Sequence, residues 1–95
     1  MNVEVLKETL DERELSKIYR ALGEPNRLRL VRALAQQEEL TCGELAALLD
    51  VSPSTASHHI AELVDCGLVS MRKQGRHHVL RLRHEMLARY APGII

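Results

Sequence analysis

The hydrophobic pattern of this 95-residue chain changes its period at Gly67, and this change limits the fold more than any other feature. Before Gly67, apolar residues recur every three to five positions, which is the spacing of amphipathic helices. After Gly67, two short runs with strand-like alternation flank a polar turn, Lys73 to Arg76, that contains a glycine. That arrangement is typical of a β-hairpin. We therefore predict a mainly α fold with one small β-hairpin.

Four helices are expected before the hairpin and one after it. Gly23 ends the first helix and Pro25 suits the first turn of the second, while Thr41 and Ser52 are good N-caps for the third and fourth. Glu44, three residues after Thr41, completes a capping-box pattern. The predicted helices span about 5–22, 25–35, 41–49, 52–66 and 84–91, and the predicted strands about 68–72 and 77–83.

A short turn at Asp50-Val51 separates the third and fourth helices, so these two helices form a helix-turn-helix. In this motif the second helix enters the major groove of DNA, with its N-terminal residues nearest the base edges. The hairpin that follows takes the position of a wing. The order α-α-α-α-β-β-α predicts one winged helix-turn-helix domain over residues 1–95, with the helix-turn-helix at about 41–66 and the wing at about 68–83.

The fourth helix has an apolar face, and its opposite face begins with short, uncharged polar side chains. Hydroxyl and imidazole groups donate to phosphates or bond to base edges. We therefore predict DNA contacts from Ser54, Thr55, Ser57, His58 and His59. Helix capping is the alternative for the serine and threonine run, and a structural role is the alternative for His59, which lies nearer the apolar face.

Basic residues surround the glycine of the predicted hairpin turn. We predict that Arg72, Lys73 and Arg76 contact phosphates or the minor groove, with a solvated charged turn as the alternative. The whole chain has a net charge of zero, but residues 1–50 carry seven Lys/Arg against ten Asp/Glu, whereas residues 51–84 carry five against two. The basic half is therefore the half that contains the wing and the second helix of the motif.

The first and last helices carry more apolar surface than a small monomer needs. We predict a homodimer that packs through helices at about 5–22 and 84–91, with an interface formed by Leu6, Leu10, Ile18, Leu87 and Tyr90. Because Tyr19 and Tyr90 are the only aromatic residues, stacking on single-stranded nucleic acid is disfavoured and duplex DNA is the predicted partner. No apolar run is long enough for a membrane, and neither a signal peptide nor a disulfide framework is recognisable, so a cytoplasmic location is expected.

Several motifs resemble the ArsR/SmtB family of winged helix-turn-helix repressors. They are the stretch LGEPNRLRL at 22–30, Leu45-Ala46, the run SPSTASHHI at 52–60, Gly67-Leu68-Val69 and Gly75-Arg76. The resemblance covers about two thirds of the chain, from Leu22 to Arg83, in the expected order. It implies a homodimer packed through the first and last helices, a palindromic operator, and repression relieved by a signal.

The metal-sensing sites that the resemblance implies are not matched. The family has a Cys-x-Cys pair where this chain reads Thr41-Cys42-Gly43, and it has paired ligands along a long last helix where this chain offers only His84 and Glu85. A tight zinc site usually needs four ligands, so we expect no metal site and no cofactor, and the inducer stays unassigned. Cys42 is either a packing residue or, at a helix N-terminus, a reactive thiol.

The predicted function is that of a DNA-binding transcriptional regulator, a repressor that binds a palindromic operator as a homodimer without the usual metal sites. One alternative is a thiol- or metal-responsive repressor that uses Cys42. A second is a winged-helix module that binds proteins instead of DNA, which the net charge of zero favours. An enzyme is not expected, because no nucleophile–base pair, phosphate-binding loop or zinc motif stands out.

Overall fold

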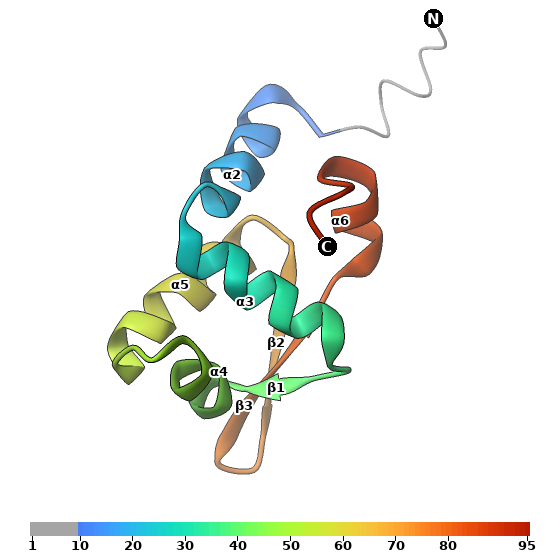
Figure 1. Ribbon diagram of the computed structural model, residues 1–95. Helices are drawn as coiled ribbons and strands as arrows, with labels where there is room; N and C mark the ends of the chain where they lie inside the picture. The colour runs from blue at the N-terminus through green and yellow to red at the C-terminus, as the bar shows by residue number, and fades with distance from the viewer. Residues whose placement is uncertain (1–9) are drawn as a thin grey trace, which may run out of the picture.

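The computed structural model describes residues 10–95, and its helices and strands follow the predicted order with one additional strand, β1 (Figure 1). In chain order they are α2 (Glu12–Leu22), α3 (Pro25–Gln36), β1 (Leu40–Thr41), α4 (Cys42–Leu49), α5 (Pro53–Asp65), β2 (Val69–Gln74), β3 (His77–Leu82) and α6 (His84–Tyr90). The three strands form an antiparallel sheet in the order β1-β3-β2. The predicted winged helix-turn-helix fold is confirmed.

Helix α2 begins later than predicted because Asp11 caps it. The Asp11 side chain accepts a hydrogen bond from the Glu14 backbone N–H at 2.9 Å, and the Glu14 carboxylate accepts one from the Asp11 N–H at 3.4 Å. This capping box places Leu10 outside the helix, so the prediction of one unbroken helix over 5–22 is wrong at this point. Residue Leu6, predicted at the dimer interface, lies outside the described residues.

Strand β1 is the element that was not predicted. Its two residues pair with β3 through Leu40↔Leu80 and Thr41↔Val79. A two-residue strand is too short to show an alternating pattern, so the sequence gives no signal for it. The pairing joins the α3–α4 connection to the wing, and Thr41 both ends β1 and caps α4.

Two glycines with positive φ set the start of the wing and the turn at its tip. Gly67, at φ 86°, follows α5 in a Schellman motif, in which the Gly67 N–H donates to the Val64 carbonyl and the Leu68 N–H to the Leu63 carbonyl. Gly75, at φ 62°, begins the two-residue turn between β2 and β3. Strand β2 therefore runs to Gln74, two residues beyond its predicted end.

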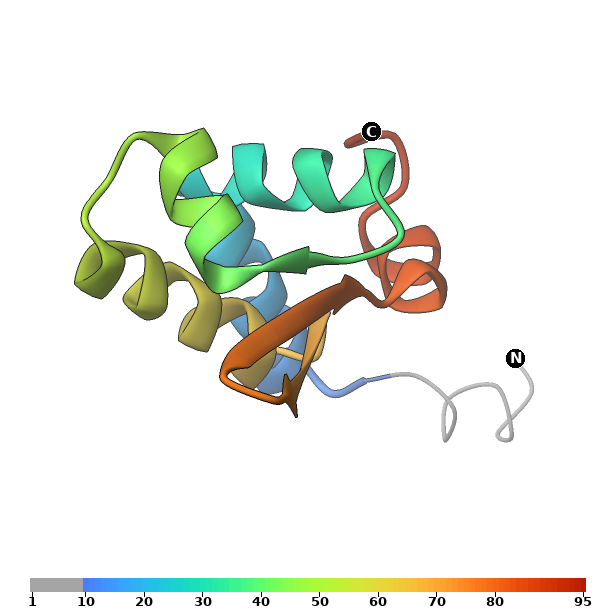
Figure 2. The ribbon, with the colours of Figure 1, turned by 90° about the horizontal axis from the view of Figure 1, so that it is seen from below.

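An aliphatic core lies among the helices and the inner face of the sheet. Its fully buried side chains come from the four helices α2 to α5, from the residue before β2 and from β3: Ile18, Leu30, Val31, Leu34, Leu45, Leu63, Leu68 and Leu80. Both ribbon views place α5 and α6 far apart, with α3 and the sheet between them (Figures 1 and 2). No helix of residues 10–95 is long and apolar enough to cross a membrane.

Candidate nucleic-acid interface

Helix α5 begins with a capped turn that exposes hydroxyl groups. The Ser52 hydroxyl accepts from the Thr55 N–H at 3.2 Å and donates to the Thr55 hydroxyl oxygen at 2.9 Å. Capping therefore accounts for Ser52 and uses one acceptor position of Thr55, whose own O–H can still donate. Ser54 and Ser57 are exposed, and neither side chain makes a hydrogen bond within the described residues.

The exposed side of α5 over its first two turns is polar and uncharged at neutral pH. Ser54, Thr55, Ser57 and His58 are all exposed there, and we call them the α5 polar face. The positive end of the helix dipole lies at this N-terminus and favours phosphate binding. The arrangement matches what a recognition helix requires, and DNA contact by these four residues stays a prediction.

His59 does not belong to this face. Only 7% of its surface is exposed, and its Nδ1 lies 3.4 Å from Nη1 of Arg27 and 3.7 Å from Oε2 of Glu24. A side chain buried in this way does not reach DNA, so the predicted DNA contact of His59 is wrong; the ring lies instead against the side chains of Arg27 and Glu24.

The neighbours of His59 form a partly buried polar group that the sequence analysis missed. Glu24 is the N-cap of α3 and accepts from the Arg27 N–H at 3.0 Å, while Nε of Arg27 donates to the carbonyl oxygen of Ala21 at 2.7 Å. We call Glu24, Arg27 and His59 the α3–α5 polar cluster. Glu24 before Pro25 is readable as a helix start, but no local pattern pairs Arg27 with a residue 32 positions away.

On the wing, the structure separates the three predicted basic residues into two groups. Arg72 donates to Glu39 at 2.9 Å and to Gln74 at 3.0 Å, and Arg81 donates to Glu38 at 2.8 Å. Lys73 and Arg76 are exposed and have no acidic partner within residues 10–95. The charge of Arg72 is therefore partly neutralised within the protein, whereas Lys73 and Arg76 keep theirs.

The two faces of the hairpin explain this separation. Neighbouring strand residues point to opposite faces, so Arg72 and Lys73 diverge. Met71 and His78 share the face of Lys73, and they line one small cavity with Ser57 and Ala61 of α5. Lys73 therefore lies on the face that adjoins α5, while Arg72 lies on the opposite face with Glu39.

Both thiols are poorly suited to fast chemistry. Cys42 is half-buried at the first position of α4, and Cys66 is buried at the C-cap of α5, where its Sγ donates to the Leu63 carbonyl at 3.4 Å. Burial raises the pKa of the Cys42 thiol and of the Cys66 thiol above their ordinary values, against the opposing effect of backbone hydrogen bonds. Because the thiolate is the reactive form, this shift lowers the fraction of each thiol that is reactive at neutral pH.

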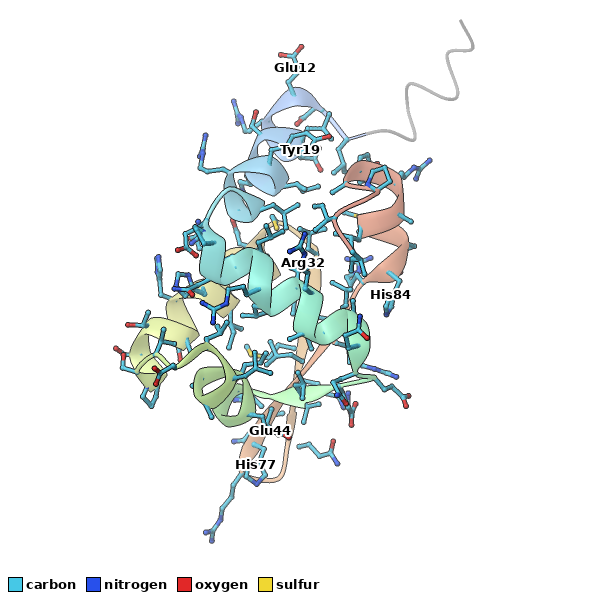
Figure 3. The ribbon with its side chains drawn as sticks, viewed as in Figure 1. Glu12, Tyr19, Arg32, Glu44, His77 and His84 are labelled. Atoms are coloured by element: carbon cyan, nitrogen blue, oxygen red, sulfur yellow. The ribbon has the colours of Figure 1, made fainter. Side chains whose placement is uncertain are left out.

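The start of α4 also holds a carboxylate beside the wing. Glu44 accepts from the Thr41 N–H at 2.9 Å, and this bond is the main reason that the pKa of Glu44 is lowered; the charge of His77 adds a smaller effect. Figure 3 shows Glu44 beside His77 of β3. Among residues 10–95, no three His, Cys, Asp or Glu side chains are placed to hold a metal ion.

The predicted dimer residues divide into core and surface. Ile18 is 0% exposed and Leu87 is 5% exposed, so both pack inside their own protomer and their assignment to the interface is wrong. A helical stripe of apolar residues does not by itself distinguish a protomer's core from a partner's surface. Leu10 and Tyr90 are half-buried, and the neighbouring Tyr19, which was not predicted, is 57% exposed and donates to the Tyr90 carbonyl at 2.8 Å.

Comparison with known proteins places this geometry among transcriptional regulators. A family described as a helix-turn-helix domain matches residues 22–72. The chain is 42% identical over 80 residues to the arsenical resistance operon repressor of Staphylococcus xylosus, covering 79% of this chain and 71% of that protein. It is 33% identical over 86 residues to the HTH-type transcriptional regulator YceK of Bacillus subtilis, covering 90% and 86%.

A solved structure extends the likeness to the whole fold. The homodimeric winged helix-turn-helix DNA-binding domain of a possible ArsR-family regulator from Mycobacterium bovis superposes with a TM-score of 0.72. The two sequences are 26% identical, and the match covers 85% of this chain and 80% of the other. The likeness therefore extends over most of the chain and includes the fold as a whole.

Proposed function

Because the chain belongs to the ArsR/SmtB family of winged helix-turn-helix transcriptional regulators, we propose that it represses transcription by binding a palindromic operator as a homodimer. The family consists of DNA-binding regulators and not of enzymes, so DNA binding is the activity to be explained. We place this activity in the cytoplasm, where a bacterial operator lies.

One observation carries the proposal: the α5 polar face adjoins the side of the wing that bears Lys73, which has no acidic partner within residues 10–95. Ser54 and His58 reach base edges in the major groove, while Lys73 and Arg76 contact the phosphates beside it. Arg72 contributes little, because Glu39 already holds its guanidinium. Near-neutral net charge is compatible with this arrangement, since local charge governs phosphate contact.

We assign the dimer interface to the end of the molecule where α2 and α6 meet. Tyr19 is largely exposed there and donates to the Tyr90 carbonyl, Leu10 is half-buried just before α2, and a structural relative is a homodimer. Twofold symmetry repeats α5 across the dimer axis, as a palindromic site requires. The two α5 helices then read half-sites about one DNA turn apart.

The proposal includes no metal site of the kinds that the family resemblance implies. Gly43 replaces one cysteine of the Cys-x-Cys pair, Thr41 replaces the other, and α6 is only seven residues long. The raised pKa of the Cys42 thiol weighs against a fast redox response. Release from DNA by an inducer, if this chain has one, therefore proceeds through groups outside these two patterns.

A binding titration tests the proposal. The purified chain is titrated against duplex DNA from its own promoter and against a scrambled duplex of equal length, at two salt concentrations, with and without zinc, arsenite or an oxidant. Tight, salt-sensitive binding of two chains per promoter duplex is expected, unaffected by the additives. Release by zinc or arsenite would reveal a ligand set in this chain, release by oxidant would implicate Cys42, and failure to bind any duplex would favour the protein-binding alternative.

A further inference from the structure

The α3–α5 polar cluster lies where α2, α3 and α5 meet, and the ring of His59 is 5.9 Å from the ring of His58 on the α5 polar face. Arg27 projects from the first turn of α3, and its Nε binds the carbonyl of Ala21 in the last turn of α2. Its Nη1 lies 3.4 Å from Nδ1 of His59 on α5. One guanidinium therefore contacts the helix of the proposed dimer surface and the recognition helix at the same time.

The partners of His59 define the form of its ring. A guanidinium has only donors, so the contact between Nη1 of Arg27 and Nδ1 of His59 is a hydrogen bond in the ring form whose proton lies on Nε2. Glu24 holds the start of α3, because the Arg27 backbone N–H donates to its Oε2 at 3.0 Å; the same Oε2 lies 3.7 Å from Nδ1 of His59, beyond hydrogen-bond distance. The contact between α3 and α5 therefore needs an acceptor at the position of Nδ1 of His59, and it depends on that atom pointing toward Arg27.

Because His59 lies on α5, its contacts in the cluster affect where the DNA-binding side chains of the same helix point. His59 follows His58 directly, so the two side chains point in directions about 100° apart around the helix. A helix with its side chains is about 10–12 Å across, so a rotation of about 20° moves an exposed side chain by about 2 Å. Hydrogen bonds to base edges tolerate only about 0.5 Å.

We propose that Arg27 and His59 are positioning residues that set the rotation of α5 about its axis, and thereby align the α5 polar face with DNA. The inference rests on the proposed DNA-binding function. Apolar contacts of Ala56, Ile60 and Leu63 hold α5 against the core, but such contacts are not directional. The hydrogen bond to Nδ1 is directional, and it relates α5 to α2, the helix that carries the proposed dimer surface.

A second link between α2 and α5 provides the matched control. Lys17 and Asp65 form an ion pair at 3.4 Å, but their side chains are 48% and 65% exposed. Exposed pairs of this kind contribute little. Lys17→Met therefore breaks a contact between the same two helices without changing the α3–α5 polar cluster.

The experiment compares three replacements of His59 in the full chain. His59→Asn keeps an acceptor near the position of Nδ1, His59→Gln moves the amide to the position of Nε2, and His59→Leu removes both. Affinity for promoter and scrambled duplexes, dimer mass and melting temperature are measured for each. We expect His59→Gln and His59→Leu to lose at least tenfold in promoter affinity, about 1.4 kcal/mol, with dimers intact. His59→Asn and Lys17→Met should stay within threefold of the wild type.

The comparison separates the possible failures. If the wild type binds its promoter and His59→Leu binds equally well, the positioning role is refuted while the proposed function stands. If promoter affinity falls only in proportion to the folded fraction, or if Asn and Gln behave alike, the cluster serves stability alone and the proposal is wrong. If His59→Leu does not fold, the Asn and Gln pair still decides. A wild type that binds no duplex refutes the proposed function, and the positioning role with it.

Discussion

Replacement of Arg76 by alanine isolates the contribution of the wing to DNA binding. Arg76 lies in the exposed two-residue turn beside Gly75 and has no acidic partner among the described residues, so its removal breaks no internal ion pair. Each phosphate neutralised contributes about 0.9 to the slope of log K against log salt. Two wings per dimer therefore make the slope shallower by about 1.8, and a fourfold rise in salt then costs the variant about twelvefold less affinity than it costs the wild type.

The assay is a titration of promoter duplex at five or more salt concentrations, with Arg72→Ala measured in parallel. Arg72 already donates to Glu39 at 2.9 Å, so its removal should change the slope much less. Arg76→Ala should also weaken promoter and scrambled DNA about equally, because phosphate contacts carry no sequence information. An Arg76→Ala slope equal to that of the wild type, or an equal change in both variants, would refute the assignment.

Four further predictions concern recognition, stability and pH. His58→Ala should lower the ratio of promoter to scrambled affinity; an equal loss for both duplexes would show that His58 does not read bases. Leu30→Ala, at a position with 0% exposure, should cost about 2–5 kcal/mol in urea unfolding, and a cost below about 1 kcal/mol would contradict the core assignment. Gly67→Ala should cost about 1–2 kcal/mol, because the φ of 86° and not the available space disfavours a side chain there; unchanged stability would disprove this. Since the folded state lowers the pKa of Glu44, its carboxylate stabilises the protein at neutral pH, and Glu44→Gln should be less stable there. The difference in stability should vanish as the pH falls below the ordinary glutamate pKa of about 4.3 and through the lowered pKa of the folded state. A difference that grew in acid would be inconsistent with the capping role.

Local signals in the sequence were sufficient for most of the fold. Thr41 with Glu44, Ser52 with Pro53, and the glycines at 67 and 75 each specify a cap or a turn through their own chemistry, and each lies where predicted. The start of α2 differs from the prediction because the capping pair Asp11 and Glu14, and not the leucine spacing, determines where the helix begins. Strand β1 was missed because two residues carry no periodicity.

The candidate site was less predictable, because its side chains are defined by partners distant in sequence. The exposure of Ser54 and His58 follows from helical geometry and was predicted correctly. The burial of His59 against Arg27, and the pairing of Arg72 with Glu39, each join residues more than 30 positions apart. Ile18 was assigned to a dimer surface because an apolar stripe looks the same whether it faces its own core or a partner.

Footprinting of the chain on its own promoter tests the central claim most directly. A dimer that inserts two copies of α5 into the major groove should protect two related half-sites, with their centres about 10–10.5 base pairs, or a multiple of that spacing, apart. Protection should disappear at high salt and weaken for the Arg76→Ala protein. A single protected patch without a related second half-site, or no protection at concentrations where the dimer is intact, would contradict the account.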